Sequence, residues 1–267
     1  HNPLRGRLTR NLIYSTKPPA GNLLIINASH LYERHFYIWC IMRILNSLLS
    51  IILLFSTSLA CYAGVQVGTT RIIYAEGKKE ASVSLDNLDS TPYLIKSWIE
   101  NNNNAGTHFL VTPPLFRLEG KQKNVVRIFK LDGVLPADRE SLFFFNTTSI
   151  PASTTDADRN TLQIAVRTRL KLIFRPKGLS DDLPVNHAKE LSWSKNGNQI
   201  IVKNPSAFYI NFMFIKVNGQ SIVMKDKNFV APFSSASYSL PAGGGGKVEW
   251  KIINDMGGQS DLYQSSL

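Results

Sequence analysis

Few residues of this sequence have the types and spacing that catalysis or metal binding requires. After residue 63 the chain contains two histidines, His108 and His187, far apart in the sequence. A metal site needs several converging ligands, so two isolated histidines more commonly serve as surface or core side chains. The sequence also contains no G-x-S-x-G, H-E-x-x-H, C-x-x-C or P-loop motif. We therefore expect no enzyme activity, no metal site and no cofactor.

Two acidic pairs, a glycine run and one arginine are the remaining candidates for chemistry. Asp181-Asp182, and Asp156 with Asp158, fall in predicted loops without the apolar neighbours that would shift a pKa. The four glycines at 243–246 lack the strand–loop–helix context of a phosphate-binding loop, so we interpret them as a hairpin loop. Arg71 lies inside an apolar strand, where it is either a solvated outward side chain or part of a fixed anion site.

One long predicted strand stands out among the elements that would position such residues. It runs from Leu162 to Phe174, and its apolar residues recur at every second position: Leu162, Ile164, Val166, Leu170, Leu172 and Phe174. Its length would be roughly 43 Å, against roughly 17–20 Å for an ordinary strand. Either the strand bends between two sheets, or one end carries its apolar side chains beyond its own core. We favour the second interpretation, in which that end is offered to another chain.

The rest of the chain after residue 63 is predicted to be all-β. Short strands alternate with turns, Asn196-Gly197 indicates a hairpin, and Trp98 is expected in a core. Thr112-Pro113-Pro114 marks a kink or a change of sheet, with a cis bond as one option. Residues 175–182 have the Pro, Gly, Ser and charge of a linker. We therefore predict two β-sandwich domains, an N-terminal one at 64–179 and a C-terminal one at 180–267.

The segment 42–63 has the features of a Sec-type signal peptide. Met42 and Arg43 precede an apolar run from Leu45 to Leu59, and small residues flank the predicted cleavage after Ala63. A transmembrane anchor is the alternative, but this run is shorter than the ~20 residues that span a bilayer. Residues 1–41 precede a good initiator methionine and show no periodic pattern, so we interpret them as an upstream, non-native extension.

Charge and cysteine content indicate how the exported part is stabilised and which classes of partner it could bind. Cys40 and Cys61 both lie upstream of Gly64, so the exported part would rely on its cores rather than on disulfides. The net charge of the chain is +11, and the first 63 residues hold six of its 30 Lys and Arg and one of its 19 acids, which leaves +6. That excess serves solubility or docking with acidic partners. Nucleic-acid binding is not expected without a cluster of basic and aromatic residues.

Six segments, in this order, resemble the periplasmic chaperones of the chaperone–usher pathway, the PapD-like pilus chaperones. They are Thr69–Tyr74, Pro92–Glu100, Thr112–Leu118, Asp138–Pro151, Leu162–Pro176 and Ile253–Gly258. The resemblance implies two immunoglobulin-like domains in an L-shaped arrangement and a periplasmic location. It also implies that the chain binds pilus subunits by donor-strand complementation and delivers them to an outer-membrane usher. No cofactor, nucleic acid or membrane insertion of the mature chain is implied.

The resemblance also implies roles for individual residues. Arg71 and Lys171 would clamp the C-terminal carboxylate of a subunit, a contact suited to charge-assisted hydrogen bonds. Leu162, Ile164 and Val166 would fill the groove left by the subunit's missing strand. The third set, Glu140, Arg175 and Asp255, would form an interdomain ion network; the alternative for Arg175 and Asp255 is a solvated surface pair worth at most about 1 kcal/mol.

Two further expectations concern the branch of the family and the competing function. Ten residues separate Pro151 from Leu162, which resembles the short-loop branch that generally builds rod-like pili. The alternative function is a secreted structural pilin or adhesin with two immunoglobulin-like domains. A pilin would need an N-terminal donor extension and usually a cysteine pair, whereas the chain after residue 63 begins with a predicted strand and has no cysteine.

Overall fold

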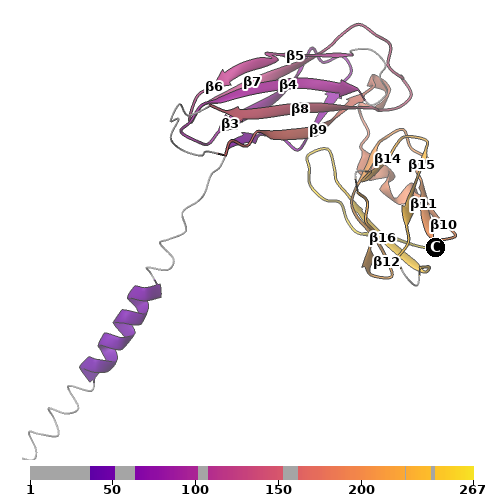
Figure 1. Cartoon of the computed structure of the whole chain (residues 1–267). Helices are drawn as coiled ribbons and strands as arrows, with labels where there is room; N and C mark the ends of the chain where they lie inside the picture. Colours follow the sequence, from indigo (N-terminus) through magenta and orange to yellow (C-terminus); the bar gives the residue numbers. More distant parts are fainter. Residues whose placement is uncertain (1–36, 52–63, 102–107, 153–161, 226, 242–243) are drawn as a thin grey trace, which may run out of the picture. The chain divides into compact units, whose positions relative to one another are not determined.

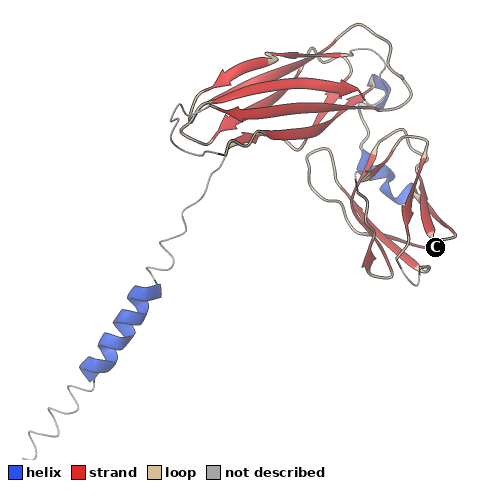
Figure 2. Cartoon of the chain, viewed as in Figure 1, coloured by secondary structure: helices blue, strands red, loops and turns tan. Residues whose placement is uncertain are grey.

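The computed structural model describes residues 37–51, 64–101, 108–152, 162–225, 227–241 and 244–267. His1–Cys61 and Tyr62–Leu267 form two separate units. In the first unit, residues 37–51 form an exposed helix (Figure 2). No helix within the described ranges combines the length and the hydropathy of a membrane span. The rest of the predicted extension at 1–41 and of the predicted signal peptide at 42–63 lies outside the described residues.

The second unit consists of β-strands with two short 3-10 helices (Figures 1 and 2). Its first strands are β1 (Val65–Val67), β2 (Arg71–Ala75), β3 (Ala81–Asn87), β4 (Tyr93–Asn101), β5 (Phe109–Thr112), β6 (Leu115–Leu118), β7 (Lys123–Lys130), β8 (Ser141–Pro151) and β9 (Val166–Arg175). The 3-10 helices η1 (Lys177–Leu179) and η2 (Pro184–Glu190) follow. The remaining strands are β10 (Ser192–Asn196), β11 (Gln199–Lys203), β12 (Ile210–Val217), β13 (Gln220–Ser221), β14 (Phe229–Val230), β15 (Ser235–Ser239), β16 (Lys247–Ile252) and β17 (Tyr263–Ser266).

Strands β1–β9 form a sandwich of two sheets. One sheet has the order β1-β3-β7-β5 and the other has the order β2-β9-β8-β4-β6, in which only β2 and β9 pair in parallel. Alternate residues of both sheets meet in one core, and Leu85, Ile95, Val126, Phe145 and Leu172 are fully buried there. This alternation is what a half-buried strand requires, so the all-β prediction for this part is confirmed.

The apolar strand expected around Arg71 forms β2, and the strand before it, β1, belongs to the other sheet. β1 pairs with β3, whereas β2 pairs with β9. The chain crosses over at Gly68, whose amide donates to Ser84 O at 2.9 Å and where a side chain would collide with Ser84. The strand therefore ends where close approach of the backbone requires a glycine. A second sequence signal, Thr112-Pro113, carries a cis peptide bond between β5 and β6.

Strands β10–β17 form the second sandwich. Its sheets have the orders β10-β11-β15 and β13-β12-β16-β17, with β14 paired to β12. The predicted hairpin is present, because β10 and β11 pair up to Asn196 and Gln199. Trp193 and Trp250 lie 5.0 Å apart between ring centroids in a separate core, and Trp250 donates its indole N–H to Ala188 O at 3.1 Å.

Two sequence predictions about individual elements are wrong. The strand expected from Leu162 begins only at Val166, which pairs with Ser149, although β8 itself continues to Pro151. Trp98, expected in a core, is half-buried on the outer face of its sheet, where the guanidinium of Arg167 lies 5.0 Å from its ring. Aromatic side chains favour this position when a cation can cover the ring.

Candidate functional site

One edge of β9 is open along half of its length. On one side β8 pairs with β9 from Val166 to Phe174. On the other side β2 reaches only Lys171 to Arg175. Among the residues that the structure describes, none pairs with the second edge between Val166 and Leu170. An unpaired edge presents backbone N–H and C=O groups to an incoming strand.

The three residues predicted to fill a partner's groove lie at and before this open edge. Leu162 is 86% exposed, Ile164 63% and Val166 55%. Val166 is the first residue of β9, and the other two precede the strand. None of the three is sealed inside its own sandwich, so their apolar surface remains accessible to another chain.

Arg71 and Lys171, which we call the cation pair, lie beside each other at the other end of the edge. They are opposite each other in the parallel pairing of β2 with β9, and neighbouring strands lie about 4.8 Å apart. Arg71 Nη1 donates to the carbonyl of Ile253 at 3.3 Å, while its Nε is buried without a hydrogen-bond partner. Lys171 Nζ donates to Asn211 Oδ1 at 2.6 Å and to Asn228 Oδ1 at 2.7 Å.

The cation pair forms no ion pair with the acids that the structure describes. No salt bridge among the described residues includes Arg71 or Lys171. Burial, together with the neighbouring Arg71, lowers the pKa of Lys171 to about 8. Burial also lowers the pKa of Arg71, although the charge of Asp255 acts in the opposite direction. Two adjacent cations that are held in place and lack a counterion form a site for an anion.

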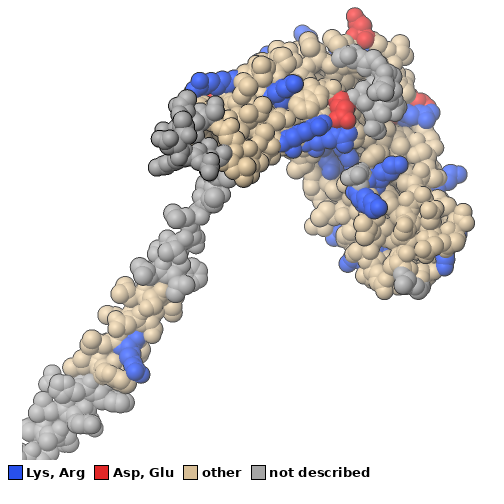
Figure 3. Space-filling model, viewed as in Figure 1, with Lys and Arg blue, Asp and Glu red and all other residues tan. Residues whose placement is uncertain are grey.

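The face of the sheet beyond the cation pair is also basic, but its charges are internally paired. Arg167 and Arg169 both reach Glu100, at 3.1 Å and 3.3 Å. The guanidinium of Arg169 also covers the ring of Phe144 at 3.5 Å. Figure 3 shows Lys and Arg side chains spread over the face in view, with few acidic side chains among them. The cation pair differs from these arginines because its hydrogen-bond partners are neutral.

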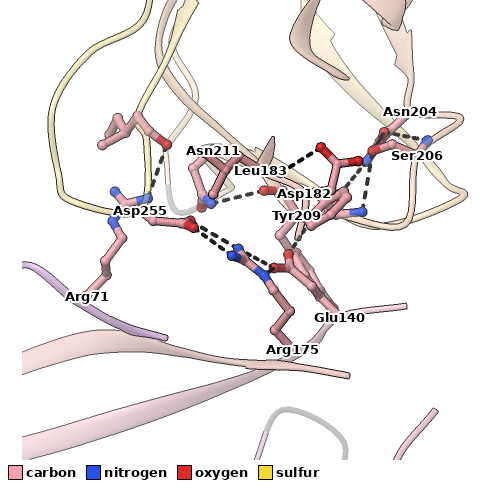
Figure 4. Close-up of polar contacts among 12 residues, drawn as sticks. Arg71, Glu140, Arg175, Asp182, Leu183, Asn204, Ser206, Tyr209, Asn211 and Asp255 are labelled. Atoms are coloured by element: carbon pink, nitrogen blue, oxygen red, sulfur yellow. Dashed lines mark hydrogen bonds and ion pairs between the residues drawn. The ribbon is translucent and has the colours of Figure 1, made fainter. Parts of the chain in front are cut away.

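The predicted ion network is present and centres on Arg175 (Figure 4). Arg175 Nε and Nη2 lie 2.8 Å and 2.7 Å from Glu140 Oε1. On its other side Arg175 contacts both carboxylate oxygens of Asp255, at 2.7 Å and 3.1 Å. Glu140 Oε2 accepts the backbone N–H of Tyr209 at 2.7 Å. The network therefore joins residues before and after the linker at 175–182.

This network is buried, so the alternative of a solvated surface pair is wrong. The Arg175 side chain is 6% exposed, that of Glu140 is 0% and that of Asp255 is 19%. Burial raises the pKa of Glu140, although Arg175 acts in the opposite direction. Burial alone would lower the pKa of Arg175, but its contacts with Asp255 and Glu140 raise it. Charges buried to this degree depend on one another strongly.

Two groups of polar residues near these sites had no recognisable signal in the sequence. Asn211 and Asn228 hold Lys171, but asparagine is too common in turns and loops to stand out in a sequence. His187 lies between two carboxylates, with Nε2 2.6 Å from Asp182 and Nδ1 2.9 Å from Glu190. Bonds from Asn186, His187 and Leu183 lower the pKa of Asp182 to about 2, so our expectation of an unshifted Asp182 is wrong.

Family models match both halves of the described β-structure. The model for pili and flagellar-assembly chaperone, PapD N-terminal domain, matches residues 64–180. The model for pili assembly chaperone PapD, C-terminal domain, matches residues 186–264. Together they cover most of the chain.

Individual proteins agree with the family models. Chaperone protein LpfB of Salmonella typhimurium is 43% identical over 204 residues, covering 74% of this chain and 87% of LpfB. Chaperone protein FocC of Escherichia coli is 37% identical over 202 residues, covering 73% of this chain and 87% of FocC.

Solved structures share the fold. A chain in the complex of the Salmonella enterica SafA pilin with the SafB chaperone is 33% identical, with a TM-score of 0.71, covering 76% of this chain and 96% of that one. The E. coli chaperone DraB is 35% identical, with a TM-score of 0.67 and the same coverage. This chain therefore belongs to the PapD family of pilus-assembly chaperones, whose two-domain β-fold it has.

Proposed function

We propose that this chain is a periplasmic chaperone that lends the open edge of β9 to a pilus subunit and passes the subunit to an outer-membrane usher. The observation that carries the proposal is the position of the cation pair at one end of that open edge, with Leu162, Ile164 and Val166 at the other. The relation to SafB, which is in complex with the SafA pilin, supports a pilin as the partner.

The cation pair would set the register of the subunit strand that pairs with β9. A C-terminal carboxylate bound by Arg71 and Lys171 receives charge-assisted hydrogen bonds from a guanidinium and an ammonium. Lys171 is five residues from Val166, so a strand that starts at the clamp reaches Val166 after roughly 17 Å. A slip of one residue would turn the partner's side chains to the wrong face, and fixing the terminus prevents that slip.

The exposed apolar residues supply the second part of the interaction. A subunit that lacks a strand exposes an apolar groove, and β-strand addition covers it with alternate side chains. Leu162 and Ile164 precede β9 in the free chain, and we propose that they extend the strand when a partner supplies the missing backbone hydrogen bonds. The ion network of Glu140, Arg175 and Asp255 would hold the two sandwiches in one arrangement during binding.

The proposal also covers the export of the chain, its domain boundaries and the branch of the family to which it belongs. We propose that the segment 42–63 directs the chain to the periplasm and is removed, and that the mature chain divides into domains at 64–179 and 180–267. The segment 153–161, on which the short-loop assignment depends, lies outside the described residues, so membership of that branch stays a prediction. No specific observation favours the alternative of a secreted pilin or adhesin, and the relatives reported above are named chaperones.

The proposal is tested by co-expressing the chain with the pilus subunits encoded beside its gene and measuring recovery of the subunit from the periplasm. Arg71→Ala and Lys171→Ala should abolish recovery while the chaperone still folds. Arg117→Ala is a matched control, because Arg117 is an exposed cation of β6 paired with Glu119. Normal recovery with both cation-pair variants would refute the assignment of the clamp.

A further inference from the structure

The side chains that hold Lys171 come from the second sandwich. Asn211 lies on β12, and Asn228 immediately precedes β14, which pairs with β12 next to Asn211. Asn211 is buried and Asn228 half-buried. The sandwich that contains Lys171 therefore does not fix the direction of this ammonium on its own.

Further bonds set the orientation of the Asn211 amide and the position of the Asn228 backbone. Asn211 donates from Nδ2 to the carbonyl of Tyr209 at 3.3 Å (Figure 4), which turns its Oδ1 towards Lys171. The backbone carbonyl of Asn228 accepts the N–H of Phe212 at 2.8 Å, which fixes that residue against β12. The ring of Phe229 lies 4.7 Å from Lys171 Nζ.

Among the described residues, the hydrogen bonds of Lys171 use two of its three donors. An ammonium has three N–H groups, and two of them point to Asn211 and Asn228. Arg71 likewise donates a hydrogen bond to a neutral group of the second sandwich, the carbonyl of Ile253. Neutral acceptors orient a cation without cancelling its charge, whereas a carboxylate in the same place would act as its counterion.

Asp255, whose charge opposes the lowering of the Arg71 pKa by burial, is bound by Arg175 through both of its carboxylate oxygens. The second sandwich thus brings uncharged oxygens within hydrogen-bond distance of the cation pair, while the carboxylate of its Asp255 is bound by Arg175. Cations that are oriented by neutral groups remain able to bind an anionic ligand.

We propose that Asn211 and Asn228 are positioning residues of the clamp, which hold the ammonium of Lys171 towards an incoming carboxylate and leave its charge uncompensated. This inference rests on the proposed function, because it concerns the same carboxylate clamp. In this inference, residues of the second sandwich contribute directly to binding of the subunit's carboxylate.

The experiment compares Asn211→Leu, Asn211→Asp and the equivalent Asn228 variants in the full chain. The pKa of Lys171 is followed by NMR of its side chain, and subunit recovery is measured by periplasmic co-expression. Asn211→Leu removes an acceptor from the charged form and should lower the pKa of Lys171 from about 8 to about 7. Asn211→Asp adds a counterion and should raise the pKa above 8.

Both Asn211 variants should reduce subunit recovery at least about tenfold, the equivalent of 1.4 kcal/mol. The leucine variant misplaces the ammonium, and the aspartate variant fills the site that the ligand needs. A merely structural role of Asn211 would instead lower the free energy of unfolding, which urea unfolding of each variant measures. Asn198→Asp is the matched control, because it adds the same charge in an exposed hairpin loop of the same sandwich.

The outcomes separate this inference from the proposed function. If Lys171→Ala leaves subunit recovery unchanged, the proposed function fails. If Lys171→Ala abolishes recovery but the Asn211 and Asn228 variants keep both the recovery and the pKa of Lys171, only the positioning role is overturned. A loss of recovery with an unchanged pKa of Lys171 would also overturn it.

Discussion

Replacing Arg175 by methionine should destabilise the protein far more than the loss of a surface ion pair. The change leaves Glu140, whose side chain is 0% exposed, without its counter-charge. Removing one partner from a buried pair costs about 3–5 kcal/mol, whereas an exposed pair contributes about 0–1 kcal/mol. Because burial already raises the pKa of Glu140, the uncompensated carboxylate should take up a proton, so the loss should be smaller at pH 5 than at pH 7.

Urea unfolding measures this effect when both sandwiches are followed. Far-UV circular dichroism reports all strands. In a Trp98→Phe background of the chain from residue 64 onwards, the fluorescence of the buried Trp193 and Trp250 reports the second core. The double variant Arg175→Met with Glu140→Gln should recover about 1–3 kcal/mol, because the buried charge is removed together with its partner. A loss below about 1 kcal/mol for Arg175→Met, or simple additivity in the double variant, would show that the network does not act as a buried unit.

Three other predictions follow from the site and its surroundings. Affinity for a subunit should fall about tenfold between pH 7 and pH 9, because Lys171 loses its proton near pH 8; Lys171→Arg should remove this dependence. Ile164→Asp should abolish subunit recovery and change the free energy of unfolding by less than about 0.5 kcal/mol, because Ile164 is 63% exposed. Burial lowers the pKa of His187, but Glu190 and Asp182 outweigh it and raise the value. The stabilisation of the fold by these His187 ion pairs should be complete below the ordinary histidine pKa of about 6.5 and decline at higher pH. In urea unfolding at several pH values, His187→Asn should remove that decline.

The long strand illustrates what a sequence pattern can predict. Alternation from Leu162 to Phe174 identifies one apolar face, because side chains of a strand point in alternate directions. It does not show which neighbour covers that face. β9 starts at Val166, opposite Ser149, although β8 continues to Pro151. Leu162 and Ile164, before Val166, are exposed, and the extension of the strand through them against a partner stays a prediction.

The arrangement around the cation pair depends on contacts between distant parts of the chain. Asn211 and Asn228 lie 40 and 57 residues beyond Lys171, and only the packing of β12 and β14 against β9 makes them its partners. The resemblance to pilus chaperones supplied the residues Arg71 and Lys171 and the ion network, but not these asparagines. Trp98 was misplaced for a related reason, because an aromatic residue in a strand fits either a core or an outer face covered by Arg167.

The most direct measurement of strand donation is hydrogen exchange at the backbone amides of Val166–Leu170, with and without a bound subunit. In antiparallel pairing with β8, alternate amides of this segment already bond to β8, and the others face the open edge. We predict that the amides at the open edge exchange rapidly in the free chain and become protected in the complex. A stable complex in which these amides keep their free-state exchange rates would contradict the account.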